Sequence, residues 1–576
     1  MPVHNSDVAG FFNRIADLLE IKGENPFRIR AYRNAARTIG GLSKSVADLV
    51  EKGADLSELP GIGNDLAQKI ERAVRTGSLP LLENLQKELP PELPDLMKIQ
   101  GLGPKKVRAL YEELGIASVG QLKKAAEGKK IQQLSGFGET TEKKIKGELR
   151  RLEKKKGEKE RIKISIAEQI VNPLLAYLKK AEGIKSMQVA GSYRRRKETV
   201  GDLDILVSCK KGSPVIDRFA EYEEVNKVLT QGKTKSSVLL KSGLQVDLRV
   251  VPQISFGSAL HYFTGSKEHN IAVRKMGVKK KLKINEYGVF KGRKRVAGKT
   301  EKQVYGKVGL PYIEPELREN RGELEAAAKK ALPRLLSLHD IKGDLHVHTR
   351  TTDGQSSLEE LAEGAKKKGY RYLAITDHSQ HVSVAKGLDV GRLRKQITEI
   401  DRLNEKLKGI RILKSIELDI LEDGSLDLPN EVLCELDLVV CSIHYKFNLS
   451  REKQTKRIIK AMDNPAFNIL SHPTGRLINE RKPYEVNIEK VMEAAGERGC
   501  FLELNAHPDR LDLHDTHCKM AKESGVKIAI GTDAHRIDDL DLMRYGVGQA
   551  RRGWLEAEDV LNTRDWIGLK KLLKRG

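Results

Sequence analysis

The sequence predicts a multidomain chain in which helical domains and an α+β domain are followed by a seven-stranded (β/α)7 barrel. Three observations support this prediction. Glycine turns that precede lysine-rich helices recur three times before residue 140, apolar strands that carry aspartates lie between residues 187 and 250, and short apolar strands that end in histidine or carboxylate recur after residue 343. At roughly 100–200 residues per domain, a chain of 576 residues has room for several domains.

The charge balance points to a polyanionic partner. Lys and Arg number 104 and Asp and Glu 80, which leaves a net charge of +24. Such an excess suits nucleic acid first and an anionic membrane second, and the alternative is a surface that is merely well solvated. No apolar run approaches the roughly 20 residues of a membrane helix, so we expect no membrane partner. The five cysteines lack paired spacing, which is typical of a reduced, cytoplasmic protein. With a nucleic acid as partner, we expect association with the nucleoid.

Three glycine turns indicate how the first part of the chain binds this partner. Leu59–Gly63, Ile99–Gly103 and Leu134–Gly138 each place a hydrophobic residue between two glycines, and each precedes a helix rich in lysine. Glycine permits a tight turn, and the amides that begin the next helix can bind a phosphate. The trio resembles helix–hairpin–helix modules, which grip the DNA backbone without reading bases; ordinary helical connectors are the alternative. The glycines expected at the DNA are Gly61, Gly63, Gly101, Gly103, Gly136 and Gly138.

A first candidate active site lies on two apolar strands predicted at 202–207 and 245–250. Because strand side chains alternate between faces, Asp202 and Asp204 share one face, and Asp247 lies on the corresponding face of the second strand. Placed side by side, the strands gather three carboxylates, which repel one another unless cations compensate. Two Mg²⁺ or Mn²⁺ ions would do so, and would stabilise the attacking and leaving oxygens of a phosphoryl displacement. The alternative is a set of solvated surface aspartates.

The turn that precedes these strands is suited to a triphosphate. Gly191 and Ser192 supply backbone N–H and hydroxyl donors, and Arg195 can add a charged clamp.

With this turn and these aspartates, residues 1–320 resemble a family X DNA polymerase of the polymerase beta type. The G-S-[FY]-x-R turn, the D-x-D pair and the later single Asp form the nucleotidyltransferase signature of that superfamily. The resemblance implies that Asp202 and Asp204 bind both metal ions, and that Asp247 binds the catalytic ion and helps to activate the primer 3′-OH. The chain departs from the family at Arg196, where glycine is frequent, and at Lys267, where vertebrate members carry Asp.

The segment 262–266 (Tyr-Phe-Thr-Gly-Ser) resembles the family motif that abuts the sugar of the incoming dNTP. The resemblance implies that Tyr262 discourages ribonucleotides. Extending the match places Asn270 near the minor-groove edge of the base and Arg274 near the template. The nucleotide-binding residues implied here are Tyr262, Phe263, Gly265 and Asn270.

The amino-terminal part of the chain also resembles the family. Residues 25–33 resemble its DNA-end-binding segment, and the match makes Tyr32 a DNA-binding residue. Lys69 falls where vertebrate relatives place a Schiff-base lysine, which implies processing of abasic sites or 5′-deoxyribose phosphate. A lysine nucleophile needs a depressed pKa. Asp65 stands where those relatives carry a helpful lysine, so contact with a DNA phosphate is the alternative role for Lys69.

The last part of the chain contains a second group of reactive residues. Eleven of the 14 histidines lie in the last 238 residues, and histidine is a frequent metal ligand. Apolar runs end in ligand-type residues at positions 346, 378, 417, 444, 472, 503 and 533, which are 27 to 39 residues apart. One strand–helix unit takes about 30 residues. The spacing therefore predicts seven βα units with reactive groups at the strand C-termini, and such His and carboxylate sets suit Zn²⁺, Mn²⁺ or Fe.

Residues 339–576 resemble the polymerase and histidinol phosphatase (PHP) domain through their H-x-H, D-G, T-D-H, Glu, S-x-H, S-H-P and D-A-H motifs. The resemblance implies a trinuclear site of Zn²⁺ or Mn²⁺ that activates a water for attack on phosphorus, as in a 3′-to-5′ exonuclease. It assigns His346, His348, Glu417 and Asp533 to one metal, Asp353, His378 and His535 to a second, and Glu417, His444 and His472 to the third.

These inferences predict a gap-filling repair polymerase with a 3′-to-5′ exonuclease and 3′-end-processing domain. We expect a monomer that acts on gapped or primed double-stranded DNA with dNTPs. A DNA-binding phosphoesterase with weak or no polymerase activity, a small-molecule phosphatase and a non-enzymatic DNA scaffold are the alternatives; two complete sets of ligands argue against them. The predicted domains are an end-binding helical domain (1–95), a fingers-like helical domain (96–160), a nucleotidyltransferase palm (161–252), a thumb-like nucleotide-selection domain (253–320), a linker (321–338) and a PHP domain (339–576).

Overall fold

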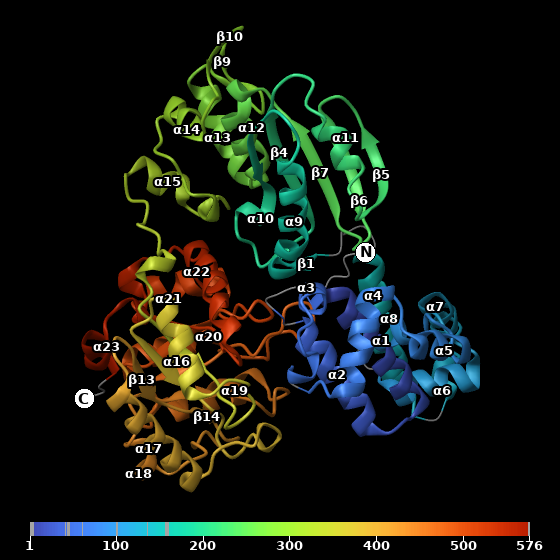
Figure 1. Cartoon of the computed structure of the whole chain (residues 1–576), viewed down its shortest axis with the longest axis vertical. Helices are drawn as coiled ribbons and strands as arrows, with labels where there is room; N and C mark the ends of the chain where they lie inside the picture. The colour runs from blue at the N-terminus through green and yellow to red at the C-terminus, as the bar shows by residue number, and fades with distance from the viewer. Residues whose placement is uncertain are drawn as a thin grey trace. The chain divides into compact units, whose positions relative to one another are not determined.

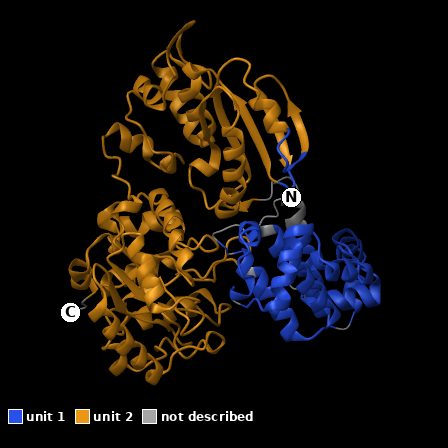
Figure 2. Ribbon diagram, viewed as in Figure 1, with its two compact units in different colours: residues 1–160, 221–226, 240–243 blue, residues 161–220, 227–239, 244–576 orange. Residues whose placement is uncertain are grey.

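The structure is a computed structural model, and it describes residues 5–573 except residues 41, 43–45, 60, 100, 101, 135 and 156–160. The chain divides into two compact units (Figure 2). The first comprises residues 1–160, 221–226 and 240–243, and the second comprises residues 161–220, 227–239 and 244–576. None of the described helices is both long enough and apolar enough to cross a lipid bilayer.

The first unit is mainly helical. Its described α-helices are α1 (Asn5–Lys22), α2 (Pro26–Gly40), α3 (Val46–Glu51), α4 (Asn64–Thr76), α5 (Pro80–Glu88), α6 (Pro104–Leu114), α7 (Val119–Glu127) and α8 (Glu139–Lys155). Phe12, Ile39 and Ile70 are fully buried in one apolar core, shared by α1 to α5. Val107 and Ile145 are fully buried in a second core, shared by α6 to α8. Burial of these apolar side chains, spaced along one face of each helix, stabilises the two helical groups.

The three glycine turns share one backbone geometry. In each turn the residue between the glycines is buried, and its N–H donates at 3.0 Å to the carbonyl three residues earlier; the pairs are Ile62 and Leu59, Leu102 and Ile99, and Phe137 and Leu134. Gly63 and Gly103 begin α4 and α6 in an extended conformation, and neither helix has a side-chain cap. Such an uncapped helix start offers backbone N–H groups to an anion. Gly101 lies outside the described residues.

The second unit contains a five-stranded sheet in the order β2-β4-β7-β6-β5, and Figure 1 shows β4, β7, β6 and β5 side by side. The strands are β2 (Ile184–Val189), β4 (Asp202–Cys209), β7 (Gln245–Val250), β6 (Lys235–Leu240) and β5 (Val225–Gln231). β4 and β7 run parallel, whereas β2 is antiparallel to β4 and β6 is antiparallel to β7. The surrounding elements are β1 (Ile162–Lys163), α9 (Ile164–Lys179), α10 (Gly191–Arg194), β3 (Thr199–Val200) and α11 (Val215–Ala220).

Helices and a small antiparallel sheet follow the five-stranded sheet. They are α12 (Phe256–Thr264), α13 (Lys267–Lys279), β8 (Lys283–Asn285), β9 (Gly288–Lys291), β10 (Lys294–Ala297), α14 (Glu301–Val308) and α15 (Glu323–Ala328). Arg318 is fully buried here, and its guanidinium lies 2.6 Å from the carboxylate of Glu301. A buried arginine needs such a partner, because an unpaired charge in the interior is strongly destabilising.

Residues 343–531 form a closed barrel of parallel strands. They are β11 (Gly343–Val347), β12 (Tyr372–Ile375), β13 (Arg411–Lys414), β14 (Glu417–Asp419), β15 (Val440–Ser442), β16 (Ile469–Leu470), β17 (Phe501–Asn505) and β18 (Ile528–Gly531). β13 and β14 are consecutive pieces of one strand, so the barrel has seven strand positions. The bridges between His378 and Glu417 and between Val347 and Ala534 join its two sheets into a ring. The predicted seven-stranded barrel is confirmed.

Alternate strand residues of the barrel face two different cores, as the pleat requires. In β12, Leu373 and Ile375 pack in the large core with the surrounding helices. Tyr372 and Ala374 belong to a smaller core, to which Leu569 of the last helix contributes. The barrel helices are α16 (Leu358–Lys367), α17 (Val390–Lys406), α18 (Asn430–Leu433), α19 (Arg451–Met462), α20 (Ile488–Arg498), α21 (Asp515–Glu523), α22 (Met543–Arg552) and α23 (Trp566–Leu573), and Figure 1 shows most of them around the strands.

Candidate active sites

Three carboxylates meet on β4 and β7. The parallel register sets Asp204 directly opposite Asp247, and Asp202 opposite Gln245. The amide of Gln245 donates to Oδ1 of Asp247 at 3.1 Å. The intervening residues of both strands are fully buried, so alternation holds the carboxylates on the opposite, half-buried face. The structure thus brings together the three aspartates that the sequence singles out.

The turn formed by residues 190–198, called here the Gly191 turn, approaches these carboxylates closely. Gly191 has φ +64°, and a Cβ at this position would lie 3.0 Å from Oδ2 of Asp204. Both facts favour glycine, which tolerates positive φ and has no side chain to clash. The Arg195 guanidinium lies in the same region. Its Nε donates to Glu319 at 3.0 Å and its Nη1 to the carbonyl of Thr264.

The predicted sugar motif ends α12 and leads into α13. Tyr262 and Phe263 form an edge-to-face pair with centroids 5.1 Å apart. The amide nitrogen of Asn270 donates to the carbonyl of Tyr262 at 2.6 Å, and its buried Oδ1 lacks a partner among the described residues. A buried acceptor without a partner is costly, so this oxygen is available to a ligand. Arg274 is exposed, and it lines a small pocket together with Tyr262 and Asn270.

The two amino-terminal candidates lie in contact with each other. Tyr32 is only 2% exposed and packs against Phe12 with ring centroids 5.7 Å apart. Nζ of Lys69 lies 5.5 Å from the centre of the Tyr32 ring, and Lys69 also bonds to Asp65. Burial lowers the pKa of Lys69, but the contacts with Asp65 and Tyr32 outweigh burial and raise it. In this arrangement Lys69 is an ammonium, the form that contacts phosphate.

The second candidate site lies at the C-terminal ends of the barrel strands. His346 and His348, at the end of β11, have their Nε2 atoms 3.1 Å apart. Both nitrogens lie within 3.6 Å of Oε2 of Glu417 and within 3.5 Å of Oδ1 of Asp533. These four residues come from β11, β14 and the end of β18, so barrel closure assembles a set that is dispersed in the sequence.

The remaining predicted ligands lie around this set. Oδ2 of Asp353 lies 3.3 Å from Nε2 of His378 and 3.4 Å from Nε2 of His535. On the other side, Oε1 of Glu417 lies 3.3 Å from Nε2 of His444 and 3.0 Å from Nε2 of His472. The cluster therefore contains every barrel residue that the sequence resemblance names, with Glu417 at its centre.

The cluster is strongly polarised. Burial opposes ionisation of Glu417, but the imidazoles of His444, His378 and His346 hold the pKa of its carboxyl well below the usual range. Burial likewise opposes protonation of His444 and His535, yet neighbouring carboxylates raise the pKa of each ring to about 9. Cations between the carboxylates and imidazoles would replace these protons, because metal ligands must be deprotonated.

The donor set fits divalent metals. Nδ1 of His348 and Nδ1 of His378 are buried without a hydrogen bond in the described structure. They lie 3.6 Å from Asp353 Oδ1 and 2.9 Å from Glu417 Oε2, respectively. An imidazole nitrogen that lies close to a carboxylate oxygen without an aligned hydrogen bond is suited to share a cation with that oxygen. Three groups of candidate ligand atoms have the spacing of metal sites. Within each group, all the ligand atoms lie within 4.8 Å of one another.

Further residues orient the candidate ligands and were not among the predicted site residues. Glu503, at the end of a predicted strand, accepts from Nδ1 of His346 at 2.7 Å. Asp419 lies 3.2 Å from Nδ1 of His444, and Ser442 donates to Glu417 at 2.5 Å. Such partners fix the ring orientation and basicity of metal-binding histidines. The apolar strand before Glu503 and the S-x-H motif that contains Ser442 were the available sequence signals; Asp419 had none.

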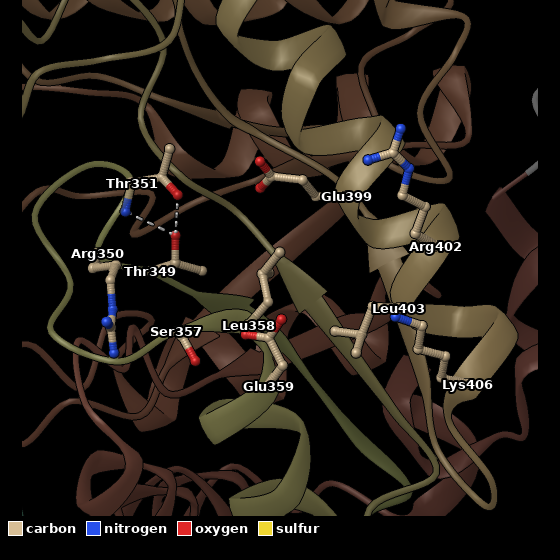
Figure 3. Close-up of a pocket in the computed structure, with 10 residues that line it drawn as sticks. All are labelled: Thr349, Arg350, Thr351, Ser357, Leu358, Glu359, Glu399, Arg402, Leu403 and Lys406. Carbon is tan, nitrogen blue, oxygen red and sulfur yellow. Dashed lines mark hydrogen bonds between the residues drawn. The ribbon is translucent and has the colours of Figure 1, made fainter.

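A separate cavity of about 400 Å³ begins one residue beyond His348 (Figure 3). It is lined by Thr349, Arg350, Thr351, Ser357, Leu358, Glu359, Glu399, Arg402, Leu403 and Lys406. None of the candidate metal ligands lines it. Figure 3 shows Thr349 bonded to Thr351 in its wall, and the same Thr349 hydroxyl donates to Asp377 at 2.6 Å. Basic and acidic side chains are mixed in the lining, so the cavity is distinct from the metal cluster in position and in charge.

Five family models match consecutive parts of the chain. They are a helix-hairpin-helix domain (residues 3–79), a SAM-like helix-hairpin-helix tandem (93–151), the DNA polymerase beta palm (161–258), the DNA polymerase beta thumb (259–319) and the PHP domain (344–507). The carboxylate site lies within the palm match, and all but two of the candidate barrel ligands, Asp533 and His535, lie within the PHP match.

One of the relatives matches the whole chain, whereas others match only its PHP part. The DNA polymerase/3′-5′ exonuclease PolX of Bacillus subtilis is 41% identical over 577 residues, which covers 100% of each chain. A probable phosphatase of Thermoanaerobacter sp. is 35% identical over 243 residues, which is 40% of this chain and 94% of the relative. A probable phosphatase of Caldanaerobacter subterraneus is 32% identical over 38% of this chain and 86% of the relative. By its full-length identity and its order of matched domains, this chain belongs to the PolX family of DNA polymerases, which join a polymerase beta-type palm and thumb to a PHP domain.

Proposed function

We propose that the chain fills short gaps in DNA during repair and trims 3′ ends with a separate active site in its PHP domain. The observation that carries the polymerase part is the parallel register of β4 and β7, which sets Asp204 beside Asp247 and next to the Gly191 turn. The substrates are gapped or primed double-stranded DNA and dNTPs. The predicted domain boundaries at residues 95, 160, 252, 320 and 338 are part of this proposal.

For nucleotide addition, the residues of the palm divide the work. Asp202, Asp204 and Asp247 would hold two Mg²⁺ or Mn²⁺ ions, which neutralise the charge that develops on the transferred phosphoryl group. Asp247, half-buried beside Gln245, would accept the proton of the primer 3′-OH. The Gly191 turn would supply donors to the triphosphate, and Oδ1 of Asn270, which has no hydrogen-bond partner among the described residues, would meet the edge of the base.

For 3′-end hydrolysis, the strand ends of the PHP barrel would hold up to three Zn²⁺ or Mn²⁺ ions, which supply Lewis acidity and activate water. Glu417 bridges the cluster because its two oxygens face different imidazoles: Oε2 faces His378, and Oε1 faces His444 and His472. Glu503 and Asp419 lie against Nδ1 of His346 and Nδ1 of His444, so each would orient its imidazole partner for metal binding. Arg510, whose Nε lies 3.4 Å from Asp533, adds positive charge beside the site.

The second candidate function is a DNA-binding phosphoesterase with weak or no polymerase activity. The similarity of the PHP part to free-standing probable phosphatases favours it. A primer-extension assay with Mg²⁺ or Mn²⁺, run with and without dNTPs on a short-gap substrate, separates the two. Extension with dNTPs and shortening without them support our proposal. Shortening under both conditions, with no extension at any dNTP concentration, would favour the phosphoesterase.

Binding to gapped DNA should weaken steeply as salt increases. The uncapped starts of α4 and α6 and the basic helices would contact phosphates, and each contact releases condensed counterions. Between about 50 and 200 mM salt we expect the affinity to fall at least about tenfold. Fluorescence anisotropy with a labelled gapped duplex measures it. An affinity that stays flat over this range would contradict binding through the DNA backbone.

The role of Lys69 is tested by borohydride trapping on a 5′-deoxyribose phosphate substrate. If Lys69 is the Schiff-base nucleophile, wild-type protein forms a covalent adduct and Lys69→Ala does not. Because Asp65 helps to raise the pKa of Lys69, Asp65→Ala should lower that pKa, expose more free amine at neutral pH and increase the trapped fraction. Equal trapping by wild type and Lys69→Ala would remove Lys69 from the role and leave phosphate contact.

A further inference from the structure

The Gly191 turn of the palm is held by residues of the PHP domain, within the second compact unit. Arg552, the last residue of α22, has a side chain only 2% exposed. Its Nη1 donates to the backbone carbonyl of Arg195 at 2.8 Å and to Oε1 of Glu319 at 2.9 Å. Its Nη2 donates to Asp515 at 2.6 Å. One guanidinium from the PHP domain therefore reaches the main chain of the turn.

The same contacts also orient the Arg195 side chain. Glu319 accepts from Arg552 and, through the same oxygen, from Nε of Arg195 at 3.0 Å. Burial opposes ionisation of Glu319, but the Arg195 and Arg552 guanidinium groups hold the pKa of its carboxyl below the usual range. The other end of the Arg195 guanidinium donates to the carbonyl of Thr264, in the sugar motif. Arg552, Glu319 and Arg195 thus form a chain of charged hydrogen bonds that ends at the nucleotide site.

Two further contacts support the turn from the same side. Arg196 has φ +56°, a conformation that strains a residue with a side chain. A Cβ at Gly548 of α22 would lie 3.6 Å from Cβ of Arg196, so the helix packs along that side chain. Glu198 accepts two hydrogen bonds from Arg476 of the barrel, at 2.7 and 3.3 Å. Contacts with the PHP domain at Arg196 and at Glu198 therefore support the turn beside the strained residue.

We propose that Arg552 is a positioning residue for nucleotide addition: from the PHP domain, it fixes the conformation of the Gly191 turn that binds the triphosphate of the incoming dNTP. The hydrogen bonds that join Arg552, Glu319 and Arg195 involve none of the candidate metal ligands of the PHP domain. Loss of Arg552 should therefore weaken dNTP binding and leave excision intact. This inference rests on the proposed triphosphate-binding role of the Gly191 turn.

Steady-state incorporation by full-length Arg552→Gln at a short gap tests the inference. We expect the KM for dNTP to rise about tenfold, the effect of losing one charge-assisted hydrogen bond, with kcat changed less than about twofold. The KM for dNTP of Arg552→Lys should lie between the values for wild type and Arg552→Gln. Lysine keeps the charge, but an ammonium cannot replace the planar set of guanidinium donors that reaches three acceptors. Excision without dNTPs should match wild type in both variants.

Arg544→Gln is the matched control. Arg544 lies on the same helix and pairs with Glu168 of α9 at 3.3 Å, and in the described part of the chain it makes no hydrogen bond to the Gly191 turn. Its KM for dNTP should equal that of wild type. An unchanged KM in folded Arg552→Gln would overturn the proposal. Equal rises in Arg552→Gln and Arg544→Gln would also overturn it, because the effect would then be general loosening between palm and PHP domain.

Two further variants keep the result interpretable. Arg552→Gln leaves Asp515 buried with one partner fewer, which can prevent folding. The double variant Arg552→Met/Asp515→Asn removes both charges of the pair, and we expect the same rise in the KM for dNTP. A wild-type KM in this folded double variant would overturn the proposal.

Ser192→Ala tests the turn itself. If Ser192→Ala leaves the KM for dNTP unchanged, the triphosphate assignment fails; if it raises the KM while Arg552→Gln does not, only the positioning role fails.

Discussion

Asp247→Ala should reduce nucleotide incorporation by at least about 10³-fold, the scale on which a group that stabilises the transition state acts. Asp247 lies directly opposite Asp204 across the parallel pair β4 and β7, so it completes the carboxylate cluster. Alanine keeps the strand but removes the carboxylate that we propose to hold a metal ion and to accept the primer 3′-OH proton. Extension of a primer at a short gap, followed by gel analysis over time, measures the loss.

The same variant should still shorten 3′ ends without dNTPs at the wild-type rate. Asp217→Ala is a suitable control, because Asp217 lies on α11 and bonds to Gln231, away from the cluster. It should keep both activities. Extension by Asp247→Ala near the wild-type rate would remove Asp247 from the catalytic site.

His346→Ala should produce the opposite result, with excision reduced by at least about 10³-fold and incorporation largely intact. The His346 ring lies within 3.6 Å of both Glu417 and Asp533, and Glu503 fixes its second nitrogen. Removing the imidazole displaces any metal held there and leaves Glu417, Glu503 and Asp533 with one partner fewer. His472→Ala should have a similar effect, because that ring pairs with the other oxygen of Glu417.

The control for these variants is His339→Ala, an exposed histidine just before the barrel that is absent from the cluster. It should retain excision, and circular dichroism should show that all three variants are folded. Robust excision by both His346→Ala and His472→Ala would place the nuclease elsewhere in the chain. A modest loss of incorporation is compatible with our account, because PHP residues contact the Gly191 turn.

Periodic local patterns explain why much of the fold was predictable. The seven strand ends recur at nearly constant spacing, because each βα unit needs a similar length of chain. Asp202 and Asp204 are two residues apart on an apolar strand, so alternation alone places them on one face. The three glycine turns repeat one local geometry, and their shared sequence reflects it.

The unpredicted parts depend on contacts between residues that are distant in sequence. Glu319 and Arg552 are ordinary charged residues in the sequence, and only the packing of α22 against the palm brings them to Arg195. Asp419 becomes a partner of His444 because two neighbouring barrel strands align them. Nζ of Lys69 lies 5.5 Å from the centre of the ring of Tyr32, which is 37 residues earlier in the chain. No local pattern encodes such pairings.

The central claim is that one chain contains two separate metal-dependent active sites. The most direct test measures incorporation with dNTPs and excision without them, on the same preparations of wild type, Asp247→Ala and His346→Ala. Our account predicts a crossed result: Asp247→Ala loses incorporation and keeps excision, and His346→Ala loses excision and keeps most incorporation. Loss of both activities in either folded variant would contradict it and would mean that the two reactions share one site or one obligatory conformation.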